Sequence, residues 1–178
     1  MVHDIAQLGA GVLRQTASPV NDVNTGEIRQ LIEDMHNTLA TSQGVGLAAP
    51  QIGVSKQVII VASRPTQRYP NAPLMAPTVM INPSFTQRSE EKDKDWEGCL
   101  SIPGIRALVP RYSRIAIHYL DEQGLPIALN LDGFIARVFQ HEYDHLLGKV
   151  YLDRVEINSD IFAESEYFKL FDIQTANA

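Results

Sequence analysis

Apolar residues recur at helical spacing in one early segment, between about residues 25 and 41. They fall at i, i+3, i+4, i+7 and i+11, and they are Ile28, Leu31, Ile32, Met35 and Leu39. Thr25 or Asn24 can cap the first turn of such a helix. The pattern therefore predicts an amphipathic helix that packs against a core by one face.

Shorter apolar runs predict β-strands, and the last two of the four runs alternate. These runs cover residues 57–62, 78–82, 114–120 and 127–131. The sequence Asp-Glu-Gln-Gly between the last two runs predicts a hairpin turn at residues 121–124. Four prolines predict a surface loop at residues 64–77, and the charged residues 87–95 predict a solvated turn.

A second helix is predicted after Asp132, which can cap it, and Gly148 stands where a helix usually ends. Residues 159–171 predict a last helix, with Ser159 or Asp160 as its cap. The order of helix, strands and helix predicts an α+β fold with mostly antiparallel sheets. We expect residues 1–178 to form a single domain.

Composition narrows the class of protein. With 44% hydrophobic and 20% charged residues over 178 positions, the chain is expected to be globular. Its net charge of -6 argues against a direct nucleic-acid binder, and one cysteine excludes an internal disulfide framework. The chain starts without a secretory-signal pattern, and no apolar run approaches the ~20 residues of a membrane span. We expect a cytoplasmic protein that does not bind membranes.

The second helix carries the sequence Gln-His-Glu-Tyr-Asp-His at residues 140–145. His141 and His145 are four residues apart, so both imidazoles lie on one helix face and can reach one metal ion. Glu142 lies about 100° around the helix, where it can contact a water on that metal without binding the metal itself. Two buried histidines of an ordinary core are the alternative, but the full motif on a helix favours a metal site.

The residues alone leave the third ligand open. A pattern with a third histidine would place it at position 151, but this residue is Tyr151. A glutamate from a following helix would be Glu164 or Glu166, as in zinc endopeptidases. The third option is Cys99, a soft thiolate donor beside Gly98, for which a buried inert cysteine is the alternative.

Three separated segments together resemble the peptide deformylases. They are Gly-Val-Gly-Leu-Ala-Ala-Pro-Gln-Ile-Gly at 44–53, Glu-Gly-Cys-Leu-Ser at 97–101, and Gln-His-Glu-Tyr-Asp-His-Leu-Leu-Gly at 140–148. The resemblance runs from about residue 5 to about residue 154. It implies mostly antiparallel sheets packed around a central metal-binding helix, with an N-terminal helix.

The resemblance also implies a set of roles for the residues of these motifs. Cys99, His141 and His145 would hold the metal, with water in the fourth position. Glu142 would act as general acid and base while this water attacks a formyl carbon, and Gln51 and the Leu100 backbone would stabilise the oxyanion. The implied cofactor is one Fe(II) ion per chain, for which nickel, cobalt or zinc can substitute.

The implied reaction removes the formyl group from formylmethionine on newly synthesised polypeptides and releases formate. Residues expected to bind the substrate are Val45, Gly46, Glu97, Gly98, Arg106, Phe134 and Val138. Among these, Val45, Phe134 and Val138 are the candidates for an apolar methionine pocket with the His141 ring, and Arg137 is expected to line its mouth. Glu97 and Arg106 are expected to form an ion pair.

The expected partners are N-formylmethionyl nascent peptides and, transiently, the ribosome. Residues 155–178 lack the long basic helix of some family members, which argues against attachment through the tail. Two other classes compete with this hypothesis. One is a zinc endopeptidase that uses Glu164 or Glu166, and the other is a protein of the same fold that only binds metal or peptide.

Overall fold

The computed structural model describes residues 1–65 and 69–176, with side chains described up to residue 170. Within this part the elements are η1 (Gly11–Arg14), α1 (Gly26–Ala40), β1 (Gly46–Ala48), η2 (Ala49–Ile52), β2 (Val58–Ser63), β3 (Met75–Gln87), β4 (Lys92–Cys99), β5 (Ile102–Tyr112), β6 (Arg114–Leu120), β7 (Pro126–Asp132), α2 (Gly133–Leu146), η3 (Tyr151–Arg154), η4 (Asn158–Asp160), β8 (Ile161–Ala163) and α3 (Glu164–Ala176). No helix in the described ranges has the length and apolar character to cross a membrane.

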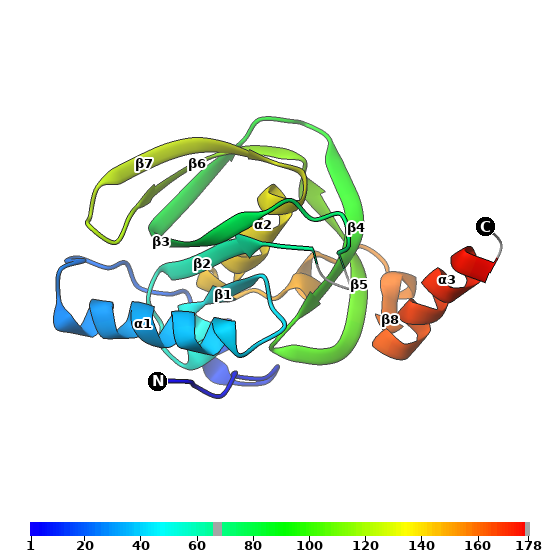
Figure 1. Ribbon diagram of the computed structural model, residues 1–178, viewed down its shortest axis with the longest axis horizontal. Coiled ribbons are helices and arrows are strands. Elements are labelled where there is room, and N and C mark those ends of the chain that lie inside the picture. The colour runs from blue at the N-terminus through cyan, green and yellow to red at the C-terminus, as the bar shows by residue number, and fades with distance from the viewer. Residues whose placement is uncertain (66–68, 177–178) are drawn as a thin grey trace.

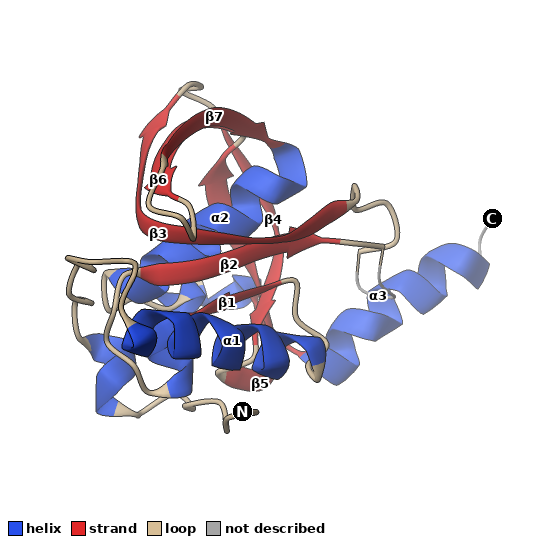
Figure 2. Ribbon diagram, turned by 60° about the vertical axis from the view of Figure 1, so that its left-hand side comes forward, coloured by secondary structure: helices blue, strands red, loops and turns tan. Residues whose placement is uncertain are grey.

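The described strands form two antiparallel sheets around helix α2. The larger sheet has the order β1-β2-β3-β6-β7, and the smaller has the order β4-β5-β8. Figure 1 shows α2 enclosed by the sheets, α1 lying along the larger sheet and α3 projecting away from the body. A second view shows the same enclosure of α2 (Figure 2). The predicted α+β fold, with antiparallel sheets around a central helix and a helix near the N-terminus, is confirmed.

Strand β2 is buried on both faces because a helix covers each one. Val58 and Ile60 belong to the apolar cluster that contains the buried face of α1. Ile59 and Val61 belong to the cluster that contains the α2 residues Ala136, Val138 and Phe139. A strand covered on both faces needs apolar residues at successive positions, which explains the uninterrupted run in its sequence.

The first predicted helix and the predicted hairpin are both present. The Thr25 hydroxyl accepts a hydrogen bond from the Ile28 backbone N–H at 3.3 Å and so caps α1. The hairpin between β6 and β7 turns on Asp121, whose carboxylate accepts from the N–H groups of Gln123 and Leu125 at 2.9 and 2.8 Å. Local side-chain chemistry therefore sets both boundaries.

Strand β3 is longer than the predicted strand at 78–82, which was expected to end at Pro83. The register of β3 against β6 shifts between Ile81 and Ser84, and Asn82 has a φ of 48°. The Asn82 side chain bonds both backbone groups of Val20 at 2.8 Å. This bulge lets the strand continue, because it leaves Pro83 outside the regular hydrogen-bond ladder.

The prediction of a solvated turn at residues 87–95 is wrong for its second half. Lys92–Cys99 forms β4 and pairs with β5, from Lys92 opposite Tyr112 to Glu97 opposite Ala107. The charged side chains at 92–95 are exposed, so their pattern marks a solvent-facing strand. Sequence analysis did not predict β5, which contains Pro103 and Pro110.

The last helix begins later than predicted. Residues 161–163 pair with β5 as β8, so α3 starts at Glu164, and Ser159 and Asp160 lie in the 3-10 turn before β8. Asp132 stands at the N-cap of α2 without a capping hydrogen bond from its side chain. Residues 66–68 of the predicted loop at 64–77 lie outside the described residues.

Candidate active site

Helix α2 and the end of β4 bring three potential metal ligands together. His141 and His145 lie on neighbouring turns of α2, with ring centroids 5.3 Å apart, and His145 is fully buried. The Cys99 Sγ is 3.3 Å from His145 Nε2, and one ligand atom of each residue lies within 4.8 Å of the others. A tetrahedral ion with bonds of about 2.0–2.3 Å holds its ligand atoms about 3–4 Å apart. The three residues therefore fit a single ion.

The three side chains also set each other's protonation. Burial raises the pKa of the Cys99 thiol, but the facing His145 and His141 rings bring it well below its ordinary value. Burial lowers the pKa of His141, but the Cys99 sulfur and the Glu97 carboxylate raise it well above normal. A thiolate between two imidazoles is the form in which cysteine binds metals.

The other candidates for third ligand have different partners. The Tyr151 hydroxyl donates to the Ile105 carbonyl at 3.0 Å. Glu164 accepts from Arg106, and Glu166 forms an exposed ion pair with Lys169 at 2.8 Å. In the described part of the chain, the cluster suited to a metal contains Cys99 and neither of these glutamates.

Glu97 orients His141 from behind the ligand cluster. Its carboxylate lies 2.9 Å from His141 Nδ1, which leaves Nε2 to face the ligand cluster. It also accepts from Arg111 at 2.9 and 3.0 Å and from Arg137 at 2.9 Å. Burial raises the pKa of Glu97, but Arg111 and His141 outweigh burial and hold it well below the ordinary value. The expected ion pair between Glu97 and Arg106 is therefore wrong, since other cations surround Glu97.

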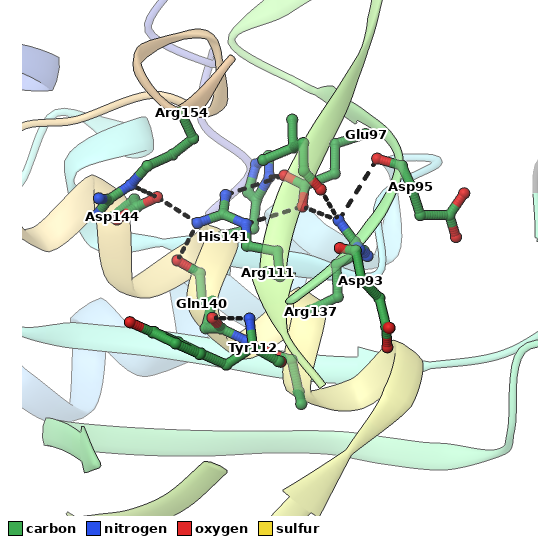
Figure 3. A network of polar contacts seen from close by, with 12 residues as sticks. Asp93, Asp95, Glu97, Arg111, Tyr112, Arg137, Gln140, His141, Asp144 and Arg154 are labelled. Atoms are coloured by element: carbon green, nitrogen blue, oxygen red, sulfur yellow. Dashed lines mark hydrogen bonds and ion pairs between the residues drawn. The ribbon is translucent and has the colours of Figure 1, made fainter. Parts of the chain in front are cut away.

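The polar network extends from Glu97 through Arg111 to Asp144 and Arg154, as Figure 3 shows. Arg111 reaches Asp144 on α2 at 2.5 Å, and Arg154 binds the same carboxylate at 2.5 and 3.0 Å. The network ties α2 to β4, β5 and η3, so it fixes the helix that carries the two histidines. Sequence analysis missed Arg111, Asp144 and Arg154, although Asp144 lies inside the His-Glu-x-x-His motif.

Glu142 is buried beside β1. A Cβ placed on Gly46 would lie 2.4 Å from Glu142 Oε1, so only glycine fits there without displacing the carboxylate. The other oxygen, Oε2, has no hydrogen-bond partner among the described residues. Burial raises the pKa of Glu142 to about 7, although the positive charges of His141 and His145 oppose this shift. Such a carboxylate can exchange a proton near neutral pH.

Gln51 and Leu100 lie beside Cys99. The Gln51 side-chain carbonyl accepts from the Ala48 N–H at 2.8 Å, which turns its amide nitrogen toward Ser101 Oγ at 3.2 Å and Cys99 Sγ at 3.5 Å. Leu100 occupies the turn between β4 and β5. Both residues line the pocket beside the cluster, and each can present an N–H group to it.

Most residues that the sequence singled out line one pocket. Its lining includes Val45, Gly46, Gln51, Glu97, Gly98, Cys99, Leu100, Arg106, Phe134, Arg137, Val138, His141 and Glu142. It also includes Tyr69, whose ring centroid is 4.7 Å from that of Phe134. Sequence analysis missed Tyr69 because a tyrosine in a proline-rich loop carries no periodic signal.

Comparison with known proteins agrees with this geometry. The family model described as polypeptide deformylase matches residues 2–160. Peptide deformylase 2 of Nostoc sp. is 49% identical over 166 residues, which cover 93% of each chain. Peptide deformylase 1 of Bordetella pertussis is 47% identical over 155 residues, covering 87% of this chain and 88% of that one. The structure of a class I type b peptide deformylase from Acinetobacter baumannii, with Met-Ala-Ser bound, is similar at a TM-score of 0.84 and 43% identity, covering 87% of this chain and 99% of that chain.

Proposed function

The chain belongs to the polypeptide deformylase family, and from this membership we propose the roles of its individual residues in the family's reaction. The enzyme hydrolyses the N-formyl group of newly synthesised polypeptides. One observation carries the proposed roles: a thiol, two imidazoles and a buried carboxylate meet at one pocket.

Cys99, His141 and His145 would hold the metal, and their donor atoms suit it because sulfur and imidazole bind first-row metals. When bound, the ion would lower the pKa of water and polarise the formyl carbonyl. The proposed metal is Fe(II), one per chain, with nickel, cobalt or zinc able to replace it. Metal analysis of the enzyme as purified from cells without oxygen tests this choice, and active enzyme that carries mainly another metal would contradict it.

Glu142 is proposed as the general acid and base. It would accept a proton from the attacking water and later deliver it to the departing amine of the methionine. Three features support this role: its burial, the unpartnered Oε2 among the described residues, and a pKa of about 7. A group that titrates close to the working pH can serve both transfers.

Gln51 and Leu100 are proposed to stabilise the oxyanion that forms when water attacks the formyl carbon. The Gln51 amide nitrogen is already aimed toward Cys99, because Ala48 binds the carbonyl end of the same side chain. The Leu100 backbone N–H would be the second donor. Preorganised donors of this kind each contribute about 10²–10³ in rate.

The peptide is proposed to lie extended between the backbones of Val45-Gly46, at the start of β1, and Glu97-Gly98 of β4, which line the pocket. Exposed strand backbone can pair with such a peptide as an added strand. Phe134 and Val138 precede His141 on α2 by two turns and one turn, so with Val45 they give the methionine side chain an apolar wall.

The test is formate release from formyl-Met-Ala-Ser, with cleavage of the internal peptide bonds followed in the same reaction. Formate without internal cleavage is the expected result. Internal cleavage without formate would favour a zinc endopeptidase and contradict the proposal.

The proposal extends to where the enzyme works. It acts in the cytoplasm on N-formylmethionyl nascent peptides, with transient ribosome contact, and needs neither a membrane nor direct nucleic-acid recognition. Co-sedimentation with ribosomes that carry a formylated nascent chain tests the contact. Equal amounts of enzyme in the pellet with and without ribosomes would contradict it.

A further inference from the structure

Arg106 connects the substrate pocket to the C-terminal part of the chain. It lies on β5, is only 4% exposed and lines the pocket together with Gly98. A Cβ placed on Gly98 would be 2.3 Å from Arg106 Nη1, so the guanidinium packs directly against the Gly98 backbone. Any change in its position or charge would therefore reach a peptide bound along that backbone.

Glu164, which is not among the residues that line the pocket, holds this guanidinium. Its Oε1 accepts from Arg106 Nε at 3.1 Å and from Nη2 at 2.7 Å, and the two side chains are 5% and 22% exposed. Within the described residues, the hydrogen bonds of Arg106 use Nε and Nη2, so Nη1, which lies against the Gly98 backbone, is the nitrogen left for a substrate. One carboxylate oxygen shared by two nitrogens fixes the plane of the guanidinium.

The position of Glu164 is itself fixed by packing. It follows directly after β8, in which Phe162 pairs with Arg106 of β5. The rings of Phe162 and Tyr167 contact Trp96 with centroids 4.9 and 5.0 Å away. The contact thus belongs to a packed unit of β8, α3 and the smaller sheet. Its β8 and α3 parts lie beyond residue 160, where the match to the family model ends.

Other carboxylates in the pocket cannot take over this task. Glu97 already compensates Arg111 and Arg137 and orients His141. Glu142 lies against Gly46 of β1. Among the described residues, Glu164 is therefore the carboxylate that compensates the charge of Arg106.

We propose that Glu164 is a positioning residue that fixes and neutralises Arg106, and so keeps substrate selection insensitive to charge in the residues that follow formylmethionine. This inference rests on the proposed function, because it assumes that the peptide runs along Gly98. Without the carboxylate, the guanidinium keeps its full charge beside the peptide. It then attracts acidic side chains of the substrate and repels basic ones.

The test uses the metal-loaded enzyme with Glu164→Gln, which keeps the side-chain shape and removes the charge. Formate release is measured with formyl-Met-Xaa-Ala and formyl-Met-Ala-Xaa peptides in which Xaa is Glu, Gln or Lys. The ratio of kcat/KM for Glu over Lys peptides should rise about threefold to tenfold relative to the wild type in at least one series. The change should appear in KM, because the reacting formyl group is unaffected.

Two further variants separate positioning from a general loss of negative charge. Glu166→Gln removes the same charge two residues later, where the side chain is 58% exposed and pairs with Lys169, and it should leave the ratio unchanged. In an Arg106→Met background, Glu164→Gln should cause no further shift, because a residue that acts through Arg106 has no effect without it. An equal shift with Glu166→Gln, or a full shift in the Arg106→Met background, overturns the proposal.

The outcomes distinguish this inference from the proposed function. A wild-type enzyme that releases no formate from any peptide contradicts the function. A wild-type enzyme that releases formate, with the same Glu-to-Lys ratio in Glu164→Gln, contradicts only the inference. Because the ratio compares two substrates on one preparation, partial unfolding or partial metal loading does not affect it.

Discussion

Replacing Glu142 with glutamine should stabilise the metal-free enzyme, and by more at higher pH. Burial raises the pKa of this carboxyl group from 4.5 to about 7 in the folded chain. Below pH 4.5 the group is protonated in both the folded and the unfolded state, so its ionisation costs nothing. Between pH 4.5 and 7 the unfolded chain loses this proton first, so the folded state is increasingly destabilised, and above pH 7 the cost is complete.

The size of the effect follows from the same shift. Each pKa unit corresponds to about 1.4 kcal/mol, so ionising Glu142 costs the folded state about 3 kcal/mol above pH 7. At pH 5 most of this cost is absent. Glutamine carries no charge at any pH, so it avoids the ionisation cost. Any free-energy cost of burying its amide N–H groups is the same at pH 5 and pH 8. The stability gain from Glu142→Gln should therefore be about 2–3 kcal/mol larger at pH 8 than at pH 5.

Urea unfolding of the chelator-treated proteins at both pH values measures this difference. Glu166→Gln is the matched control, because its carboxylate is 58% exposed and should show no comparable trend. Once loaded with metal, Glu142→Gln should keep its metal and lose about 10²–10⁴ in turnover, the contribution of a positioned acid–base group. A stability gain that is the same at pH 5 and pH 8 would refute the electrostatic reasoning, and normal turnover per bound metal would refute the catalytic role.

The remaining predictions address the ligands, the support of the site and its selectivity. Glu97→Gln should cost about 3–5 kcal/mol of unfolding free energy and about 10–100-fold in metal affinity, because it leaves buried cations uncompensated and His141 unoriented; denaturant unfolding and metal titration check this. Gly46→Ala should lower kcat at least tenfold with metal content unchanged. The added Cβ would lie 2.4 Å from Glu142 Oε1 and would displace this carboxylate. Steady-state kinetics with metal analysis check this. Cys99→Ser should lose nearly all bound metal, whereas the rival ligand variant Glu164→Gln should keep it, as elemental analysis would show. Formyl-Met peptides should exceed acetyl-Met peptides in kcat/KM by more than the 10–200-fold or so available from one methylene in an apolar pocket, and comparable values would contradict a tight formyl site.

The sequence predicted those elements whose boundaries depend on local chemistry. The Thr25 cap with its apolar stripe located α1, and the Asp121 turn located the β6–β7 hairpin. It did not predict β5 or the extension of β3, because both strands contain prolines that normally interrupt a sheet. A bulge at Asn82 tolerates Pro83, and that bulge depends on Val20, which lies 62 residues earlier in the chain. Contacts of this kind leave no periodic pattern.

The same distinction applies to the site. The spacing of His141, Glu142 and His145 on one helix indicated their chemistry, whereas Cys99 was assigned only through the resemblance of three separated motifs. Arg111 and Arg154 have no such local signal, although they bind Asp144 in the middle of the motif helix. The pairing of Glu97 with Arg106 was expected, but Glu97 binds Arg111 and Arg137 instead. Opposite charges in a sequence do not specify partners, because the fold decides which of several arginines is near.

The arginines near the pocket form two sets, according to which carboxylate binds them. Substitutions in the two sets should affect different properties of the enzyme. Arg111 and Arg137 are bound by Glu97, whose carboxylate also orients His141, so their loss should alter metal binding and stability together. Arg106 is compensated by Glu164 from the C-terminal unit, so its change should alter peptide selection without disturbing the metal. The metal cluster and peptide selection should thus respond independently to substitution, although Cys99 follows directly in the same strand.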